Sequence, residues 1–194
     1  MLASINPLGE RGRNQSYPIT VAAYVSASTV AAALLGGGLG AVGAPLAGYA
    51  SWTVAIALLA LAGLLFDARV RGLRVPGPHR QVNEDWLTTY RGWVYGGGFG
   101  AQLGFGFATI VNASATWIAF ACALVSGSPV AGAVIGAVFG LVRSLPILST
   151  ARTHDPAALR ARLGRLDQAQ PRVGHLVLAL QAAVALALLV GVAA

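Results

Sequence analysis

The sequence predicts an all-α integral membrane protein, a single transmembrane helical domain over residues 1–194 built as a bundle of five transmembrane helices. Charged residues make up only 10% of the chain, against roughly 25% in an ordinary soluble domain. Two long tracts, 14–66 and 92–142, contain no charged residue. A helix needs about 20 apolar residues to cross the bilayer core. Each tract is therefore too long for one crossing and suits a hairpin of two.

Arginine-rich segments separate the apolar tracts and predict their orientation. The chain has no lysine, and most of its arginines lie in the N-terminal segment or in the loops 67–91 and 150–172. Arginine resists translocation and marks the cytoplasmic side of a membrane protein. We therefore expect the N-terminus and both loops in the cytoplasm and the C-terminus outside. The expected spans are 17–43, 48–66, 93–126, 130–148 and 173–194.

The first apolar run is expected to be a retained span. It follows a short polar start that carries Arg11 and Arg13, which resembles the beginning of a signal peptide. However, the run is much longer than the 7–15 residues typical of the apolar part of a signal peptide.

Both cytoplasmic loops predict an amphipathic helix beside the membrane. An Asn-Glu-Asp run at 83–85 is typical of a helix start, and Trp86, Tyr90 and Trp93 then recur at helical spacing as an interfacial aromatic belt. In the second loop, Pro156 suits the first turn of a helix. Leucines on one face and arginines off it then predict a short basic helix on the membrane surface, separate from the last span.

The third span, 93–126, is considerably longer than one crossing requires. Its excess length begins with a glycine-rich stretch at 96–100. One interpretation is a continuous tilted helix whose glycines allow close packing. The other is a helix that is broken or re-entrant at its glycine-rich start, which is tolerated at membrane depth only when buried in protein or lining a wet cavity.

Two rows of glycine recur every four residues and predict helix-packing faces. Small residues at this spacing let helix backbones approach closely in membrane bundles. The rows are Gly96, Gly100 and Gly104 in the third span, and Gly132, Gly136 and Gly140 in the fourth.

The polar residues inside the spans are the candidate site. Asn112 is the most informative, because an amide at mid-membrane needs partners on another helix; it either holds helices together or lines a solute path. Arg143 is the one charge within a span, and it either extends its head to the interface or forms a partner or anion site. The full set of solute-path or helix-contact candidates is Gln102, Thr109, Asn112, Ser114, Thr116 and Arg143.

The sequence indicates no enzyme, metal or cofactor. Its single cysteine, Cys122, has no partner and no metal-ligand spacing around it. The expected spans contain no Asp or Glu, which argues against a proton pump, and no nucleophile–base–acid set is recognisable. The arginines flank apolar spans instead of sharing a polar face, so no nucleic-acid partner is expected.

The order of parts resembles the CcdA/DsbD-like transmembrane thiol-redox family. Residues 5–8 (Ile-Asn-Pro-Leu) resemble the tail of that family's first helix, whose membrane part would be missing, and Gly140 with Leu145-Pro146 resembles its kinked later helix. The resemblance implies two related three-helix halves with a reactive cysteine in each. Here neither cysteine is present: the third span reads Thr-Ile-Val-Asn-Ala-Ser-Ala-Thr at 109–116. The resemblance therefore implies a reused scaffold whose redox function is lost.

These features support two functional hypotheses for a multi-pass protein of the bacterial cytoplasmic (inner) membrane. The first is a transporter-like permease for a small solute on the CcdA/DsbD-like scaffold, suggested by the third span and its polar residues. The alternative is a non-catalytic membrane subunit that anchors or stabilises a larger membrane protein complex. The expected partners are the lipid bilayer and either another membrane protein or a second copy of the chain.

Overall fold

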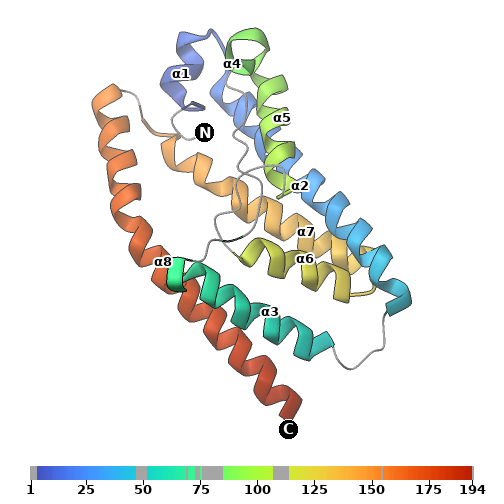
Figure 1. Ribbon diagram of the computed structural model, residues 1–194. Helices are drawn as coiled ribbons and strands as arrows, with labels where there is room; N and C mark the ends of the chain where they lie inside the picture. Colours follow the sequence, from blue (N-terminus) through green and yellow to red (C-terminus); the bar gives the residue numbers. More distant parts are fainter. Residues whose placement is uncertain are drawn as a thin grey trace.

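The computed structural model describes residues 4–46, 52–68, 70–72, 75, 85–106, 114–153 and 155–193. Over these residues the chain forms helices and no strand (Figure 1), so the prediction of an all-α fold is confirmed. The elements, in chain order, are α1 (Pro7–Gly12), α2 (Tyr17–Gly43), η1 (Ala44–Leu46), α3 (Trp52–Asp67), η2 (Val70–Gly72), α4 (Trp86–Thr89), α5 (Gly92–Gly104), α6 (Ala115–Val125), α7 (Pro129–Ser144), η3 (Leu145–Thr150) and α8 (Pro156–Ala193).

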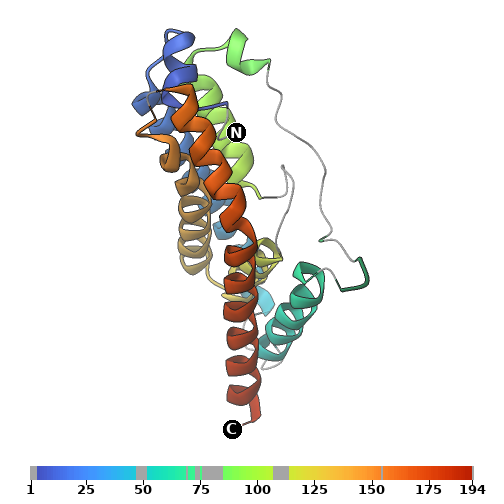
Figure 2. The ribbon, with the colours of Figure 1, turned by 90° about the vertical axis from the view of Figure 1, so that its left-hand side faces the viewer.

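Helix α2 is the central element of the bundle. It packs most extensively against α5 and α7, and it also contacts α6 and α1. Its 27 residues give a length of about 40 Å at 1.5 Å per residue. Helices α3 and α8 lie side by side as a separate pair, joined to the rest through α6 (Figures 1 and 2).

Glycines allow α7 to lie directly against the backbone of α2. A Cβ atom on Gly132 would collide with the carbonyl oxygen of Gly36, and a Cβ on Gly36 would collide with the carbonyl oxygen of Gly132. One turn on, a Cβ on Gly136 would collide with the carbonyl oxygen of Ala32. Any larger residue at these positions would push the two helices apart.

Helix α5 makes the same kind of contact with another face of α2. A Cβ on Gly100 would collide with the carbonyl oxygen of Tyr24, and a Cβ on Gly96 would lie 2.5 Å from that of Thr20. Between these glycines, Phe99 is 2% exposed and belongs to the buried apolar cluster that also contains Tyr24. Close backbone contact and side-chain burial therefore act together along α5.

Ser28 lies where α2, α5 and α7 meet. It is fully buried, and its hydroxyl donates a hydrogen bond to the carbonyl oxygen of Gly140 at 3.0 Å. Cβ atoms added at Gly104 and Gly140 would both approach the carbonyl oxygen of Ser28. A small residue on α2 and glycines on both neighbours are thus required at this one crossing.

The third expected span is not one continuous helix. Helix α5 ends at Gly104, and Gly106 then has φ +68°, in the left-handed region that disfavours residues with a side chain. Helix α6 begins at Ala115 and contacts the other end of α2, where a Cβ on Gly43 would collide with the carbonyl oxygen of Leu124. The helix is thus interrupted, but after the glycine-rich stretch 96–100 and not at it, because these glycines lie inside α5.

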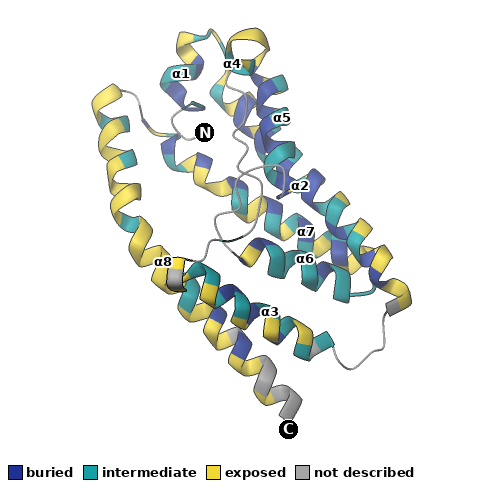
Figure 3. Cartoon of the chain, viewed as in Figure 1, coloured by how far each residue is buried: buried dark blue, intermediate teal, exposed yellow. Residues whose placement is uncertain are grey.

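The last span and the basic helix before it form one helix, which corrects the expectation of two separate elements. Helix α8 has 38 residues and contains Pro171 in its interior, so its length is about 57 Å. Proline removes one backbone hydrogen bond, here to the carbonyl of Asp167, and both residues are exposed. Figure 3 shows that the first half of α8 is largely exposed.

The aromatic belt at the start of the third span also differs from expectation. Helix α4 ends at Thr89, and Tyr90 has extended backbone angles, so Trp86 and Trp93 belong to different helices. The Trp86 ring stacks on Phe99 with centroids 5.9 Å apart. Trp86 therefore packs onto α5, while Trp93 is exposed.

Two helical stretches, Tyr17–Gly43 and Pro129–Thr150, are long and apolar enough to cross a membrane by length and composition. Each of the helices α3, α5 and α6 is shorter, with 16, 13 and 11 residues. The described residues thus support membrane association through these two stretches, and five crossings are not established by them.

Three arginine-bearing segments lie at one end of the molecule. In Figure 1, α1, α4 and the start of α8 lie at the top. A hydrogen bond of 3.0 Å from the Tyr17 hydroxyl to the carbonyl oxygen of Ile147 links the start of α2 to the end of the α7 stretch there. Near the opposite end, a Cβ on Gly40 of α2 would meet the carbonyl of Ser128, before α7.

Candidate functional site

Among the buried polar side chains in the described part of the chain, Glu10 is the one with a carboxylate. Its side chain is fully buried. It accepts hydrogen bonds from Arg13 Nη2 at 2.7 Å, from Thr20 Oγ1 at 2.7 Å, and from the Tyr95 hydroxyl at 2.7 and 2.6 Å to its two oxygens. We call these four residues the Glu10 network; it joins α1, the start of α2 and α5.

Local features of the N-terminal segment bring Glu10 to this position. The Asn6 side chain caps α1 by accepting hydrogen bonds from the backbone N–H groups of Leu8 and Gly9 at 3.1 and 2.9 Å. After α1, Asn14 has φ +55°, which turns the chain sharply before α2 begins. Glu10 therefore points back toward α2 and α5 instead of into water.

Gln15 connects this turn to the first residue of α5. Its Oε1 accepts a hydrogen bond of 2.8 Å from the backbone N–H of Gly92, one of the N–H groups at the helix start that have no partner within the helix. A Cβ on Gly92 would collide with Oγ1 of Thr20 and lie 3.3 Å from Oε2 of Glu10. Glycine at position 92 is therefore needed for α5 to reach the network.

Arg13 supplies the positive charge that balances Glu10. Burial lowers the pKa of the Arg13 guanidinium, but its hydrogen bonds with Glu10 and Tyr95 more than offset this and raise the pKa above its ordinary value. Arg13 also donates to the carbonyl oxygen of Ser4 at 2.8 Å, and its guanidinium lies 5.7 Å from the centre of the Tyr95 ring. Arg13 thus stays a cation throughout the working pH range.

A second network, buried at Ser114 and Gln181 and half-buried at Asp67, joins α3, the start of α6 and α8. The Asp67 carboxylate accepts hydrogen bonds from the Ser114 backbone N–H at 2.9 Å and from the Ser114 hydroxyl at 2.6 Å. Gln181 Nε2 then donates to Ser114 Oγ at 2.9 Å and to the carbonyl oxygen of Ala60 at 3.0 Å. We call Asp67, Ser114 and Gln181 the Asp67 network.

The Asp67 network depends on a close approach at Gly63. A Cβ at this position would lie 2.5 Å from Gln181 Nε2 and would also collide with Ser114 Oγ. Gln181 is 8% exposed, and its Oε1 accepts no hydrogen bond from the described residues. One amide thus contacts both neighbouring helices while retaining an unused acceptor.

The structure does not assemble the sequence-predicted site residues into one cluster. Ser114 belongs to the Asp67 network, and Thr116 is buried in the first turn of α6. Gln102 is half-buried on α5, and the Arg143 guanidinium on α7 lies 5.5 Å from the centre of the Phe139 ring. Thr109 and Asn112 lie outside the described residues.

The six predicted packing glycines have a common location. A Cβ added at any of them would crowd α2, most often at one of its carbonyl oxygens. They are Gly96, Gly100 and Gly104 on α5, and Gly132, Gly136 and Gly140 on α7.

Sequence reasoning missed most members of the two networks. Gln181 carried a usable signal, because it is the one amide in the final span, which is otherwise apolar after His175, and such a group needs a partner on another helix. Asp67 carried a weaker one, as the first charge after a long apolar tract. Glu10 carried none, because its partners Thr20 and Tyr95 are set by the fold of the N-terminal segment.

Fold and networks together define an all-helical protein with membrane-spanning candidates, held by glycine contacts and buried polar links. The chain is similar to proteins named methylamine utilization protein MauF: 33% identical over 151 residues to that of Paracoccus versutus (75% of this chain, 55% of the relative), 32% over 150 residues to that of Paracoccus denitrificans (75% and 54%), and 31% over 160 residues to that of Methylophilus methylotrophus (79% and 55%). The chain therefore spans about half the length of the relatives it matches. No family model and no solved structure matches it.

These relatives correct two expectations. They are named for methylamine utilization and not as CcdA/DsbD-like thiol-redox transporters, so the predicted kinship to that family is wrong. The transporter hypothesis, which relied on that scaffold, loses its support with it. The physical reason for the error is that glycine-rich helices and proline kinks are general features of membrane bundles and do not identify a family.

Replacing Glu10 with alanine is expected to destabilise the fold at its N-terminal end. The change leaves two hydroxyl donors and the Arg13 cation without their shared acceptor. We expect the free energy of unfolding to fall by about 2–4 kcal/mol. This is less than for a fully enclosed ion pair, because water screens part of the Arg13 charge. The Arg13 side chain is indeed 25% exposed. Thermal unfolding in detergent, followed by circular dichroism, should show a lower midpoint. Asp167→Asn, at an exposed position of α8, is the matched control and should leave it unchanged; an unchanged midpoint for Glu10→Ala would refute the role of the network.

Proposed function

We propose that this chain is a non-catalytic accessory protein of methylamine utilization, located in the bacterial cytoplasmic membrane. Its role would be to anchor or stabilise another membrane-associated protein of the same process. The observation that carries the proposal is the similarity, over about three quarters of this chain, to proteins named for methylamine utilization.

The chemistry of the buried polar groups supports a structural role over a catalytic one. The Glu10 carboxylate is occupied by Arg13, Thr20 and Tyr95, and Asp67 by the backbone and hydroxyl of Ser114. Catalytic acids and bases need access to a substrate at hydrogen-bond distance. These carboxylates instead accept hydrogen bonds that link neighbouring helices.

The position of three arginine-bearing segments at one end supports an orientation with five crossings. The N-terminal segment, the start of α5 after Arg91 and the start of α8 after Arg152 lie toward the same end. Under the positive-inside rule, that end faces the cytoplasm. Helices α2, α3, α7 and the later part of α8 each form one crossing, and α5 and α6 together form the remaining one.

Thiol labelling tests this orientation. Single cysteines at Pro45 and Arg152, both exposed, are introduced into a Cys122→Ala background. A membrane-impermeant maleimide should label the Pro45→Cys protein in intact cells stripped of their outer envelope. It should label the Arg152→Cys protein only after the membrane is permeabilised. Labelling of both from the same side would contradict an odd number of crossings between them.

Gene deletion tests the accessory role. In the bacterium that carries this chain, deletion of its gene should abolish growth on methylamine and leave growth on succinate with ammonium intact. A plasmid copy of the gene should restore growth on methylamine. Uptake of radiolabelled methylamine by the deletion strain, measured before any growth defect accumulates, should stay at the level of the parent strain. Normal growth of the deletion strain on methylamine would refute the proposal, and loss of uptake alone would point to transport.

A further inference from the structure

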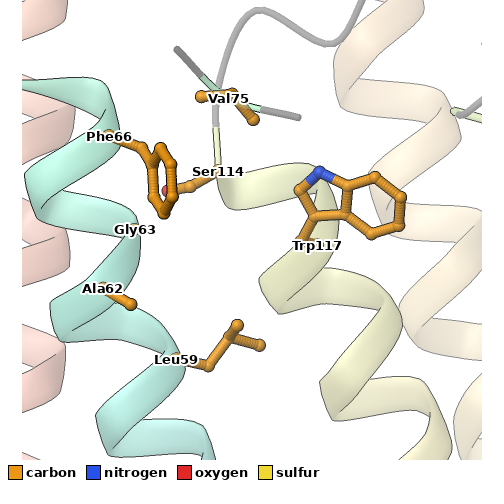
Figure 4. A pocket seen from close by; sticks show the side chains of 7 residues that line it. All are labelled: Leu59, Ala62, Gly63, Phe66, Val75, Ser114 and Trp117. Atoms are coloured by element: carbon orange, nitrogen blue, oxygen red, sulfur yellow. The ribbon is translucent and has the colours of Figure 1, made fainter. Parts of the chain in front are cut away.

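An apolar cavity of about 420 Å³ lies between α3 and α6, directly beside the Asp67 network. Figure 4 shows the seven residues that line it: Leu59, Ala62, Gly63 and Phe66 from α3, Val75, Ser114 at the N-cap of α6, and Trp117 from α6. This volume is within the range of about 300–1,000 Å³ typical of sites for small organic molecules. Among the described residues no charged side chain lines it, and it is partly open to the surface.

The cavity is expected neither to stay empty nor to fill with ordered water. An empty cavity costs free energy in proportion to its volume, because the groups around it lose their packing partners. A buried water needs two to four polar partners. Ser114 provides the polar atoms of the lining, but its hydroxyl already donates to Asp67 and accepts from Gln181. An apolar occupant therefore satisfies the lining best.

The surroundings of α3 indicate the source of that occupant. Leu58, Leu61 and Leu65, on the part of α3 turned away from the cavity, are 57, 38 and 52% exposed. In a bilayer these leucines contact hydrocarbon, so α3 also holds the apolar lining of the cavity at the depth of the lipid chains. We propose that the cavity between α3 and α6 binds one hydrocarbon chain of a membrane phospholipid.

This inference rests on the proposed membrane location and is independent of the role in methylamine utilization. It is tested in detergent micelles, so a failure of the binding experiment is distinguishable from a failure of the topology labelling or of the growth assay.

Trp117 provides a direct probe, because it lines the cavity. The chain has four tryptophans; changing Trp52, Trp86 and Trp93 to phenylalanine leaves Trp117 as the single emitter. The purified protein in dodecyl maltoside is titrated with phosphatidylcholine that carries a dibrominated stearoyl chain, which quenches tryptophan fluorescence on contact. A second protein that retains only Trp93, which is 58% exposed on α5, reports contact with lipid dispersed in the micelle.

The expected result is saturable loss of most Trp117 fluorescence near one lipid per protein, with only a shallow linear loss for Trp93. Ala62→Phe, which fills the cavity, should reduce quenching of Trp117 to the level of Trp93, and the less bulky Ala62→Leu serves if the phenylalanine variant does not fold. Leu61→Phe, on the exposed side of α3, is the matched control and should leave the quenching unchanged. Equal quenching of Trp117 and Trp93, or saturable quenching that persists in a folded Ala62 variant, would overturn the proposal.

Discussion

Direct contact between helix backbones is the constraint on which the rest of this structure depends. Along α2, carbonyl oxygens of Thr20, Tyr24 and Ser28 meet glycines of α5, while those of Ser28, Ala32 and Gly36 meet glycines of α7. Within a membrane there is no difference in hydrophobicity between lipid and leucine to hold helices together, so close packing must supply the stabilisation. The missing Cβ atoms make this packing feasible, and Ser28 serves both partners at once.

The polar networks are consequences of this close packing. Tyr95 lies one residue before Gly96, so the approach of α5 to Thr20 delivers its hydroxyl to Glu10. Gly63 has the same effect for α3, because the absence of a Cβ leaves room for the Gln181 amide and the Ser114 hydroxyl. In each case a glycine creates the space, and buried hydrogen bonds then fix how neighbouring helices are aligned.

Repeating local patterns were readable from the sequence, whereas long-range pairs were not. The two glycine rows recur at the period of a helix, so their shared face follows from the sequence alone. Glu10 and Tyr95 are 85 residues apart and Ser114 and Gln181 are 67 apart, and no local pattern encodes such pairings. The continuity of α8 through Pro171 was also missed. A proline there removes a single hydrogen bond, and the exposed carbonyl it frees is open to other partners.

Disulfide cross-linking between α2 and α7 tests the central contact most directly. A Cβ on Gly37 would lie 3.4 Å from the Cβ of Ala133, close to the roughly 3.5–4.5 Å between Cβ atoms in disulfides. In a Cys122→Ala background, the pair Gly37→Cys and Ala133→Cys should therefore form an intramolecular disulfide rapidly under mild oxidation in membranes. The pair Gly38→Cys and Ala133→Cys should not, because a Cβ on Gly38 has no neighbour within 4 Å. Equal cross-linking of both pairs, or of neither, would contradict the account.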